Sequence, residues 1–264
     1  MGRTLRTVTR LVPIVAGSMA LGVAGLWLIR ALVPQDALRA SNDVVGNYLQ
    51  GVDTMYAVLL AFVVFVVWQQ FDVARGHVER EANDCVDLHR IVGGLGDDDR
   101  ARIQGRLERY LDAVLAEEWT AMSRGDEDTI ARVTDLLDAV WDELHDVEPV
   151  TECQKALHAE ALSCFNDLSD ARMSRLTAAR THMPLSLRML LYMGAVVVSG
   201  SMYLVAVDRF AIHAIITAAM VGAVSHILYV VEDLDDAFSG DWQVSRAAFV
   251  RARARTARAT APQP

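Results

Sequence analysis

The sequence lacks the features that identify most enzymes and disulfide-stabilised proteins. It has only three cysteines, Cys85, Cys153 and Cys164, and an odd number argues against a disulfide framework. Cys85 and His89 are one helical turn apart, as two zinc ligands can be, but nothing nearby in the sequence completes such a site. No GxSxG elbow, Walker loop, HExxH helix or dinucleotide-binding glycine signature is present, so we expect no enzymatic activity and no resident cofactor.

Charged residues are also scarce in four long stretches, at residues 11–33, 52–70, 185–207 and 210–231. The second stretch carries a single charge, Asp53, over about 19 residues, and at ~1.5 Å per residue a helix of that length crosses a ~30 Å hydrocarbon core. The runs show no alternation of apolar and polar residues, which excludes a membrane β-barrel. We therefore predict an all-α polytopic membrane protein with four transmembrane helices.

The arginines at the ends of these stretches predict the orientation, because Lys and Arg close to a span are retained on the cytoplasmic side. The connections 34–51 and 208–209 have no net positive charge, since Arg39 is outnumbered by Asp36 and Asp43 and Asp208 balances Arg209, so both should face outward. Both termini and the middle of the chain are then cytoplasmic, and the expected location is the bacterial inner membrane. The arginines on the cytoplasmic side are Arg3, Arg6, Arg10, Arg75, Arg80, Arg180, Arg188, Arg246, Arg251, Arg253, Arg255 and Arg258.

The beginning of the chain admits a second interpretation. Three arginines, an apolar stretch and the later segment 37–41, Ala-Leu-Arg-Ala-Ser, resemble a secretory signal with a small-residue cleavage site. However, the apolar stretch is longer than that of a signal peptide, and Trp27 and Arg30 lie where a retained helix has its interfacial anchors. Gly22 and Gly25 would allow close contact with a neighbouring helix. We favour an uncleaved first span.

The segment 72–183 differs from the spans, since its net charge of about −12 is more negative than the −9 of the whole chain. Apolar residues at spacings of three and four predict two amphipathic helices, from Ile103 to Met122 and from Ile130 to Leu144. The predicted architecture is thus two pairs of membrane helices flanking a helical cytosolic insertion. Its parts are 1–71 with the first two spans, 72–183 as the cytosolic domain, 184–232 with the last two spans, and 233–264 as an acidic segment and basic tail.

Two stretches resemble bestrophin-like bacterial membrane proteins, a family gathered as a domain of unknown function. One begins YAVLLAFVVFVVWQQFD at Tyr56 and continues as VEREAN from Val78. The other is DLDDAFSG from Asp233, where the family often has proline at the position of Ala237, so the local turn should differ here. The resemblance implies a relationship to bestrophins, which are pentameric ion channels with four membrane helices per subunit, a helical cytosolic part and a pore lined by the second span.

The resemblance also implies which residues line the pore. Bestrophins have a constriction of apolar side chains on the outer side of a tryptophan that ends the second span. Counting back from Trp68 places Met55, Leu59 and Phe62 at comparable positions, and such a ring gates by excluding water. Large apolar residues at helical spacing are equally typical of helix packing or lipid contact. The full predicted pore-lining set is Met55, Leu59, Phe62, Val66 and Gln69.

Polar residues inside the spans are costly in lipid and normally face protein or water. Asp53, Tyr56 and His226 are the members of this group that we predict to be intramembrane polar residues. His213 and Asp53 lie close to the outer interface, where contact with water explains them equally well. His226 is further from the interface and is predicted to line a cavity or to bond across helices.

An acidic cluster follows the fourth span. Glu232, Asp233, Asp235 and Asp236 are hard oxygen ligands of the kind that Ca²⁺ prefers, and animal bestrophins have an acidic calcium-binding segment in a similar place. The spacing does not match an EF-hand loop. The alternative is that these carboxylates cap cytosolic helices or pair with Arg246 and Arg251.

These observations predict a cyclic homo-oligomer, with a pentamer favoured, that conducts inorganic ions through the lipid bilayer. The acidic cytosolic part would concentrate cations, so cation conduction is as plausible as anion conduction. The alternative is a non-conducting membrane sensor or scaffold whose cytosolic domain binds a partner. The basic residues 246–258 suit anionic lipid headgroups better than nucleic acid, which we do not expect as a partner.

Overall fold

The computed structural model describes residues 2–39 and 42–260, and within them every regular element is helical. The predicted all-α fold class is therefore confirmed. The chain forms two units: the membrane unit, consisting of Met1–Gln69 and His182–Asp235, and the insertion unit, consisting of Gln70–Thr181 and Asp236–Pro264. The residues Ala40 and Ser41 of the alternative cleavage site lie outside the described residues.

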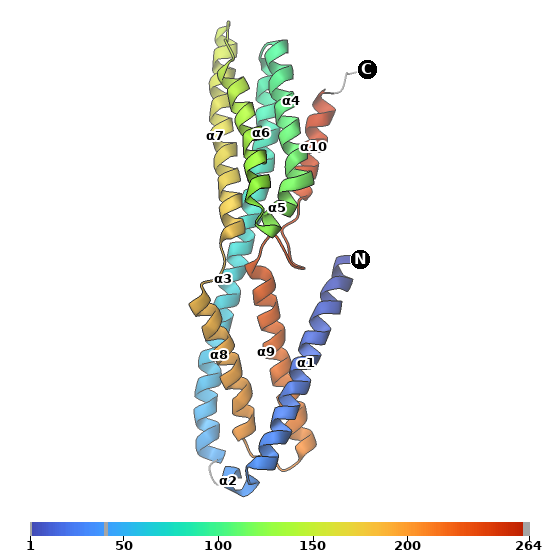
Figure 1. The fold of residues 1–264 in the computed structure, drawn as a ribbon. Helices are drawn as coiled ribbons and strands as arrows, with labels where there is room; N and C mark the ends of the chain where they lie inside the picture. Colours follow the sequence, from blue (N-terminus) through green and yellow to red (C-terminus); the bar gives the residue numbers. More distant parts are fainter. Residues whose placement is uncertain (1, 40–41, 261–264) are drawn as a thin grey trace. The chain divides into compact units, whose positions relative to one another are not determined.

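Within the described residues, four helices are long and apolar enough to cross a bilayer, as predicted. Helix α1 lies along α9, and the short α2 connects α1 to α3 at the end of the unit where α8 also meets α9 (Figure 1). The third span, α8, ends at Ser201 rather than at the predicted residue 207. A 3-10 turn, η3, then leads into the connection to α9. The elements are α1 (Gly2–Leu32), α2 (Gln35–Arg39), α3 (Asn42–Ile91), α8 (Leu185–Ser201), η3 (Met202–Leu204) and α9 (Phe210–Asp235).

Small residues allow α1 and α9 to pack closely. A Cβ atom added to Gly22 would lie 2.9 Å from a methyl group of Val221, and one added to Gly222 would lie 2.9 Å from Cγ of Met19. The hydroxyl groups of Ser18 and Ser225 hydrogen-bond across the same interface at 2.9 Å. In lipid, close van der Waals packing and such hydrogen bonds are the main forces that join helices.

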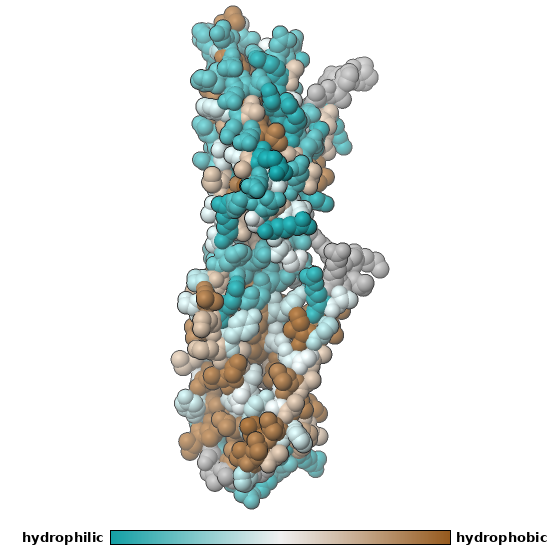
Figure 2. All heavy atoms as spheres, in the orientation of Figure 1, coloured by the Kyte–Doolittle hydropathy of each residue, from teal (hydrophilic) through white to brown (hydrophobic). Residues whose placement is uncertain are grey.

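The two units differ in the polarity of their surfaces. In the space-filling view, hydrophobic side chains gather over the membrane unit, while the insertion unit is covered mainly by hydrophilic ones (Figure 2). Many large apolar side chains of the membrane unit are exposed, among them Leu21, Val196 and Ile215. Such a surface is stable only against lipid or another protein chain.

Helix α3 is unbroken over 50 residues, so the second span continues as a helix into the insertion unit. The remaining helices of that unit share one hydrophobic core with the second half of α3. Gly125 has a φ of 67°, the left-handed conformation that ends a helix, and Thr151 caps the last long helix. The elements are η1 (Val92–Gly94), α4 (Asp97–Ala113), η2 (Val114–Glu118), α5 (Trp119–Arg124), α6 (Glu127–His145), α7 (Glu152–Arg180) and α10 (Ala247–Thr260).

The basic tail forms helix α10 and is part of the insertion unit. Phe249 is buried in the core of this unit and contacts the ring of Trp119 edge-on. Arg253 pairs with Asp112 at 2.7 Å and with Glu108 at 3.3 Å. Part of the positive charge that the sequence suggested for lipid headgroups is therefore bound to the acidic surface of α4.

Candidate functional site

The predicted pore-lining residues form one stripe along the membrane part of α3, with spacings of four and three residues. Met55 and Phe62 are 76% and 62% exposed in the single chain, and Gln69 is also exposed. Leu59 and Val66 are half-buried. The membrane unit therefore leaves this stripe free to meet a pore, lipid or another copy of the chain.

A second face of α3, about 100° round the helix from the stripe, explains which residues stay uncovered. Tyr56, Leu60, Val63 and Val67 are buried within the membrane unit, again at spacings of four and three. The hydroxyl of Tyr56 donates to the carbonyl of Leu191 on α8 at 3.2 Å. These contacts determine which face of α3 points into the membrane unit, because side chains on a helix share a face every 3.6 residues.

Gly194 is the residue of α8 that admits the Tyr56 ring. A Cβ atom at Gly194 would lie 2.4 Å from two ring carbons of Tyr56, a distance that real Cβ atoms do not reach. Tyr56, predicted as an intramembrane polar residue, thus serves as a packing residue whose hydroxyl has a backbone partner. Its place between α3 and α8 sets which side of α3 is left uncovered.

The exposed apolar surface of α3 is wider than the predicted stripe. Val58 and Phe65 are as exposed as Phe62, and Trp68 is also exposed near the end of the membrane part. Phe65 lies about 60° round the helix from Phe62, because successive residues turn by ~100°. The uncovered apolar surface of α3 thus extends beyond the predicted stripe on one side.

The other polar residues of the spans differ in their exposure within the single chain. His226 is exposed on α9, whereas His213 is buried and donates from Nε2 to the carbonyl of Met202 at 2.8 Å. Asp53 is half-buried, and its Oδ1 has no hydrogen-bond partner within the described residues. The sequence could not separate the two histidines, because both follow apolar residues at helical spacing.

Within the acidic cluster, Asp235 is committed to contacts inside the membrane unit. Its carboxylate accepts hydrogen bonds from the backbone N–H of Met183 at 2.7 Å and from Arg188 at 2.8 Å. Arg188 also pairs with Glu232 at 3.2 Å. This arginine, rather than Arg246, is the main partner of the cluster.

Asp236, in the insertion unit, forms a separate turn. Its carboxylate accepts hydrogen bonds from the backbone N–H groups of Phe238 and Ser239 and from the Ser239 hydroxyl. The described part of the chain contains no group of three or more His, Cys, Asp or Glu side chains arranged to hold a metal ion. Calcium binding by Glu232, Asp233, Asp235 and Asp236 stays a prediction, while the alternative role in capping and pairing accounts for the observed contacts.

The insertion unit contains a cluster of buried charges that the sequence analysis missed. The Arg175 guanidinium is completely buried and pairs with Glu81 of α3 at 2.5 Å and with Glu118 at 2.6 Å. Arg172 bonds the other oxygen of Glu118, and the Tyr110 hydroxyl donates to Glu81. Burial, together with the charge of Glu81, raises the pKa of Tyr110 well above its ordinary value, so Tyr110 is a neutral donor.

A sequence signal for this cluster does exist. Glu118 follows Val114 by four residues and Glu81 follows Val78 by three, so both acids lie on the buried faces of their helices. Arg172 follows Leu168 by four residues in the same way. Two acids and two bases on core faces indicate a charge-balanced buried cluster, because an unpaired charge is too costly to bury.

The comparisons with known proteins agree with this architecture. The sequence profile of the bestrophin-like domain matches residues 16–249. A bacterial Bestrophin homolog from Klebsiella pneumoniae, solved as a single-substitution variant, has 13% sequence identity and a TM-score of 0.73, and covers 94% of this chain and 99% of its own. Another structure of that homolog has 13% identity and a TM-score of 0.72 with the same coverage. No curated protein matches the sequence.

Proposed function

Because this chain belongs to the bestrophin-like domain family, we propose that it assembles into a cyclic homo-oligomeric ion channel of the bacterial inner membrane, with a pore lined by α3. Both termini and the insertion unit face the cytoplasm in this proposal, as the arginine distribution indicates. The relationship to a channel family makes ion conduction the first function to test. Ion selectivity is left open.

The observation that carries the proposal is the uncovered stripe on α3. Large apolar side chains such as Met55 and Phe62 project from the membrane unit, although another face of the same helix, about 100° away, packs against α8 through Tyr56. In a cyclic assembly, equivalent stripes from each copy would meet around the axis. A ring of apolar side chains then closes the pore by excluding water.

The direct test is the single-channel current of the purified full-length protein in planar bilayers with asymmetric KCl. We expect discrete currents, and the sign of the reversal potential distinguishes cation from anion selectivity. Silence from a well-folded oligomer would contradict the proposal and favour the sensor or scaffold alternative.

A pair of matched variants tests the lining. Phe62→Ala widens the proposed constriction and should raise the single-channel conductance severalfold, because a wider apolar ring admits water more readily. Phe65→Ala removes a side chain of the same type and exposure from the neighbouring surface of α3 and should leave conductance unchanged. A rise with Phe65→Ala and none with Phe62→Ala would contradict the proposed stripe.

A further inference from the structure

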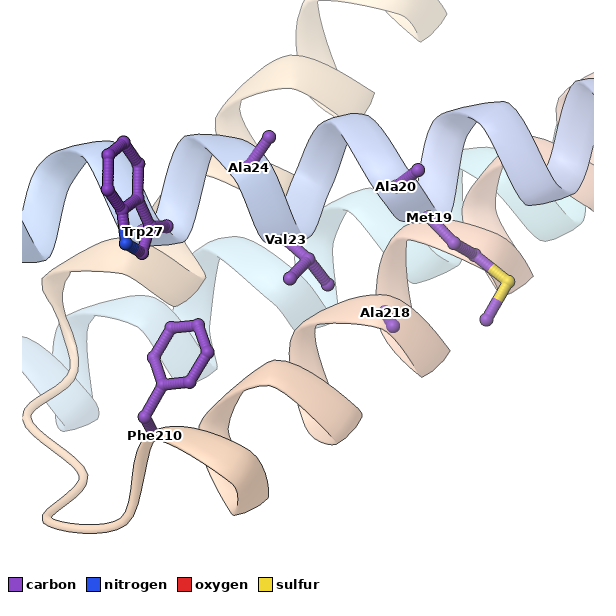
Figure 3. Close-up of a pocket in the computed structure, with 7 residues that line it drawn as sticks. All are labelled: Met19, Ala20, Val23, Ala24, Trp27, Phe210 and Ala218. Atoms are coloured by element: carbon purple, nitrogen blue, oxygen red, sulfur yellow. The ribbon is translucent and has the colours of Figure 1, made fainter.

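An apolar groove lies between α1 and α9 in the membrane unit. Its volume is about 590 Å³, within the range of ~300–1,000 Å³ that is typical of ligand pockets. Figure 3 shows Trp27 and Phe210 on opposite sides at one end of the groove, with Met19 and Ala218 toward the other end. The residues that line it are Met19, Ala20, Val23, Ala24, Trp27, Phe210 and Ala218.

The groove forms because small side chains lie along its length and two large aromatic side chains lie at one end. Ala20, Ala24 and Ala218 leave space along its length, where larger side chains would fill it. Trp27 and Phe210 are 64% and 42% exposed, so their rings form walls without closing the groove. The groove can therefore hold a linear apolar group along the surface of α1 and α9.

Arg30 lies at the aromatic end of the groove, one helical turn beyond Trp27. Its guanidinium carbon is 5.7 Å from the centre of the Phe210 ring, and its Nη2 donates to the carbonyl of Val207 at 2.7 Å. Its Nη1 is shielded from water and has no hydrogen-bond partner in the described chain. A buried donor without a partner is costly, so a small rotation of the guanidinium that brings Nη1 to an added acceptor at this end of the groove is favoured.

The charge of Arg30 is also unbalanced. No carboxylate of the described residues forms an ion pair with it, and its acceptors are backbone carbonyls. The neighbouring Asp208 carboxylate is bound instead to Arg39, at 2.5 Å. The polar end of the groove therefore presents one uncompensated positive charge to an incoming ligand.

We propose that this groove binds one phospholipid, with an acyl chain along the alanine-lined part between α1 and α9 and the phosphate against Arg30. A phosphodiester supplies both the negative charge and the acceptor oxygens that the guanidinium lacks. Trp27 and Phe210 lie beside the headgroup region, where aromatic side chains are favoured. The proposal needs the chain to span a bilayer, and it is independent of whether the protein conducts ions.

The first test is native mass spectrometry of the purified full-length protein titrated with phosphatidylglycerol. The parent should retain one lipid per subunit. Ala24→Phe fills the groove and should abolish this retention, while Arg30→Gln should weaken it roughly tenfold, since a charge-assisted bond is lost. Ala219→Phe adds the same bulk on exposed α9 outside the groove and should retain the lipid. Unchanged retention in either of the first two variants would overturn the proposal.

A second test does not depend on the folding of these variants. A benzophenone amino acid at Ala24, illuminated in membranes, should form an adduct with phospholipid. The same group at Ala219 should give no headgroup-specific adduct when phosphatidylglycerol is compared with diacylglycerol. A crosslink from Ala24 to a second copy of the chain would show that a subunit covers the groove, and would overturn the proposal.

Discussion

At the scale of single residues, the buried charges of the insertion unit are the most sensitive positions. Arg175 has no exposed side-chain surface, and its two carboxylate partners, Glu81 and Glu118, are equally buried. A buried charge that loses its partner cannot be rescued by water, so the cluster tolerates loss of a member poorly. The cluster joins α3, η2 and α7 at one point in the core of the insertion unit.

We expect Arg175→Gln to destabilise the insertion unit by about 3–5 kcal/mol, because two carboxylates are left buried without their shared cation. The measurement is urea unfolding of the full-length protein in detergent, followed by tryptophan fluorescence. Arg180→Gln is the matched control: Arg180 pairs with Glu127 on the surface, and its loss should cost under about 1 kcal/mol. Equal small losses for both variants would contradict this role of the buried cluster.

Several features of single residues follow from the chemistry of their side chains. Asp126 caps the helix that begins at Glu127 by accepting from the backbone N–H of Thr129, and Gly22 allows close packing of α1. Thr151 also caps its helix, with Gln154 as its partner in the capping box. The two caps depend on residues close in sequence, which is why the sequence predicts them well, whereas the contact of Gly22 is with Val221 on α9.

At the scale of elements, the contact between α3 and α7 contains a destabilising feature. Burial, followed by the nearby carboxylates of Asp167 and Asp87, raises the pKa of Asp84 from 3.8 to about 6. Arg80 acts in the opposite direction and Glu81 in the same one. One carboxylate oxygen of Asp84 is buried without a partner in the described chain. The folded state therefore holds a proton on Asp84 more tightly than the unfolded state does.

The sign of the pH dependence follows from linkage. Between pH ~4 and ~6 the folded chain binds more protons at Asp84 than the unfolded chain, so this group's contribution makes the protein more stable as the pH falls. Asp84→Asn should remove this contribution and stabilise the protein at pH 7 by about 1 kcal/mol, a value discounted for partial exposure. Urea unfolding at pH 4.5, 5.5 and 7 measures it.

Asp138→Asn provides the control for that series, because Asp138 is an exposed carboxylate of α6. It should leave the pH dependence of unfolding as in the parent protein. If Asp84→Asn destabilised the protein at pH 7, the carboxylate would be a stabilising partner and the predicted sign would be wrong.

At the scale of the whole molecule, the exposed apolar surface of the membrane unit needs both lipid and copies of the chain. The proposed channel predicts a closed ring, so native mass spectrometry in mild detergent should give a discrete oligomer, with five subunits favoured. A dimer that persists across detergents would contradict the channel and favour the non-conducting alternative. Arg175→Gln lies outside the membrane unit, so comparing its oligomeric state shows whether the ring depends on the insertion unit.

The sequence by itself determined the helical class, the four spans and the membrane location. Each of these depends on composition over a window of residues, and the runs 52–70 and 210–231 are so apolar that only a bilayer accommodates them as helices. The continuity of α3 was also predictable, because no proline interrupts residues 42–91, although Gly46, Gly51 and Gly76 lie within the helix. Which of the two α9 histidines is buried was not predictable, since helical spacing alone does not show which neighbours cover a given face.

Only the tertiary structure decided which side chains meet. The pairing of Arg175 with Glu81 joins residues 94 positions apart, and the buried face of α3 is set by Tyr56 entering the space beside Gly194. Likewise, the groove beside Arg30 exists only because α1 and α9 lie together. Contacts of this kind depend on the packing of distant segments, whereas hydropathy and capping act over a few turns of one helix.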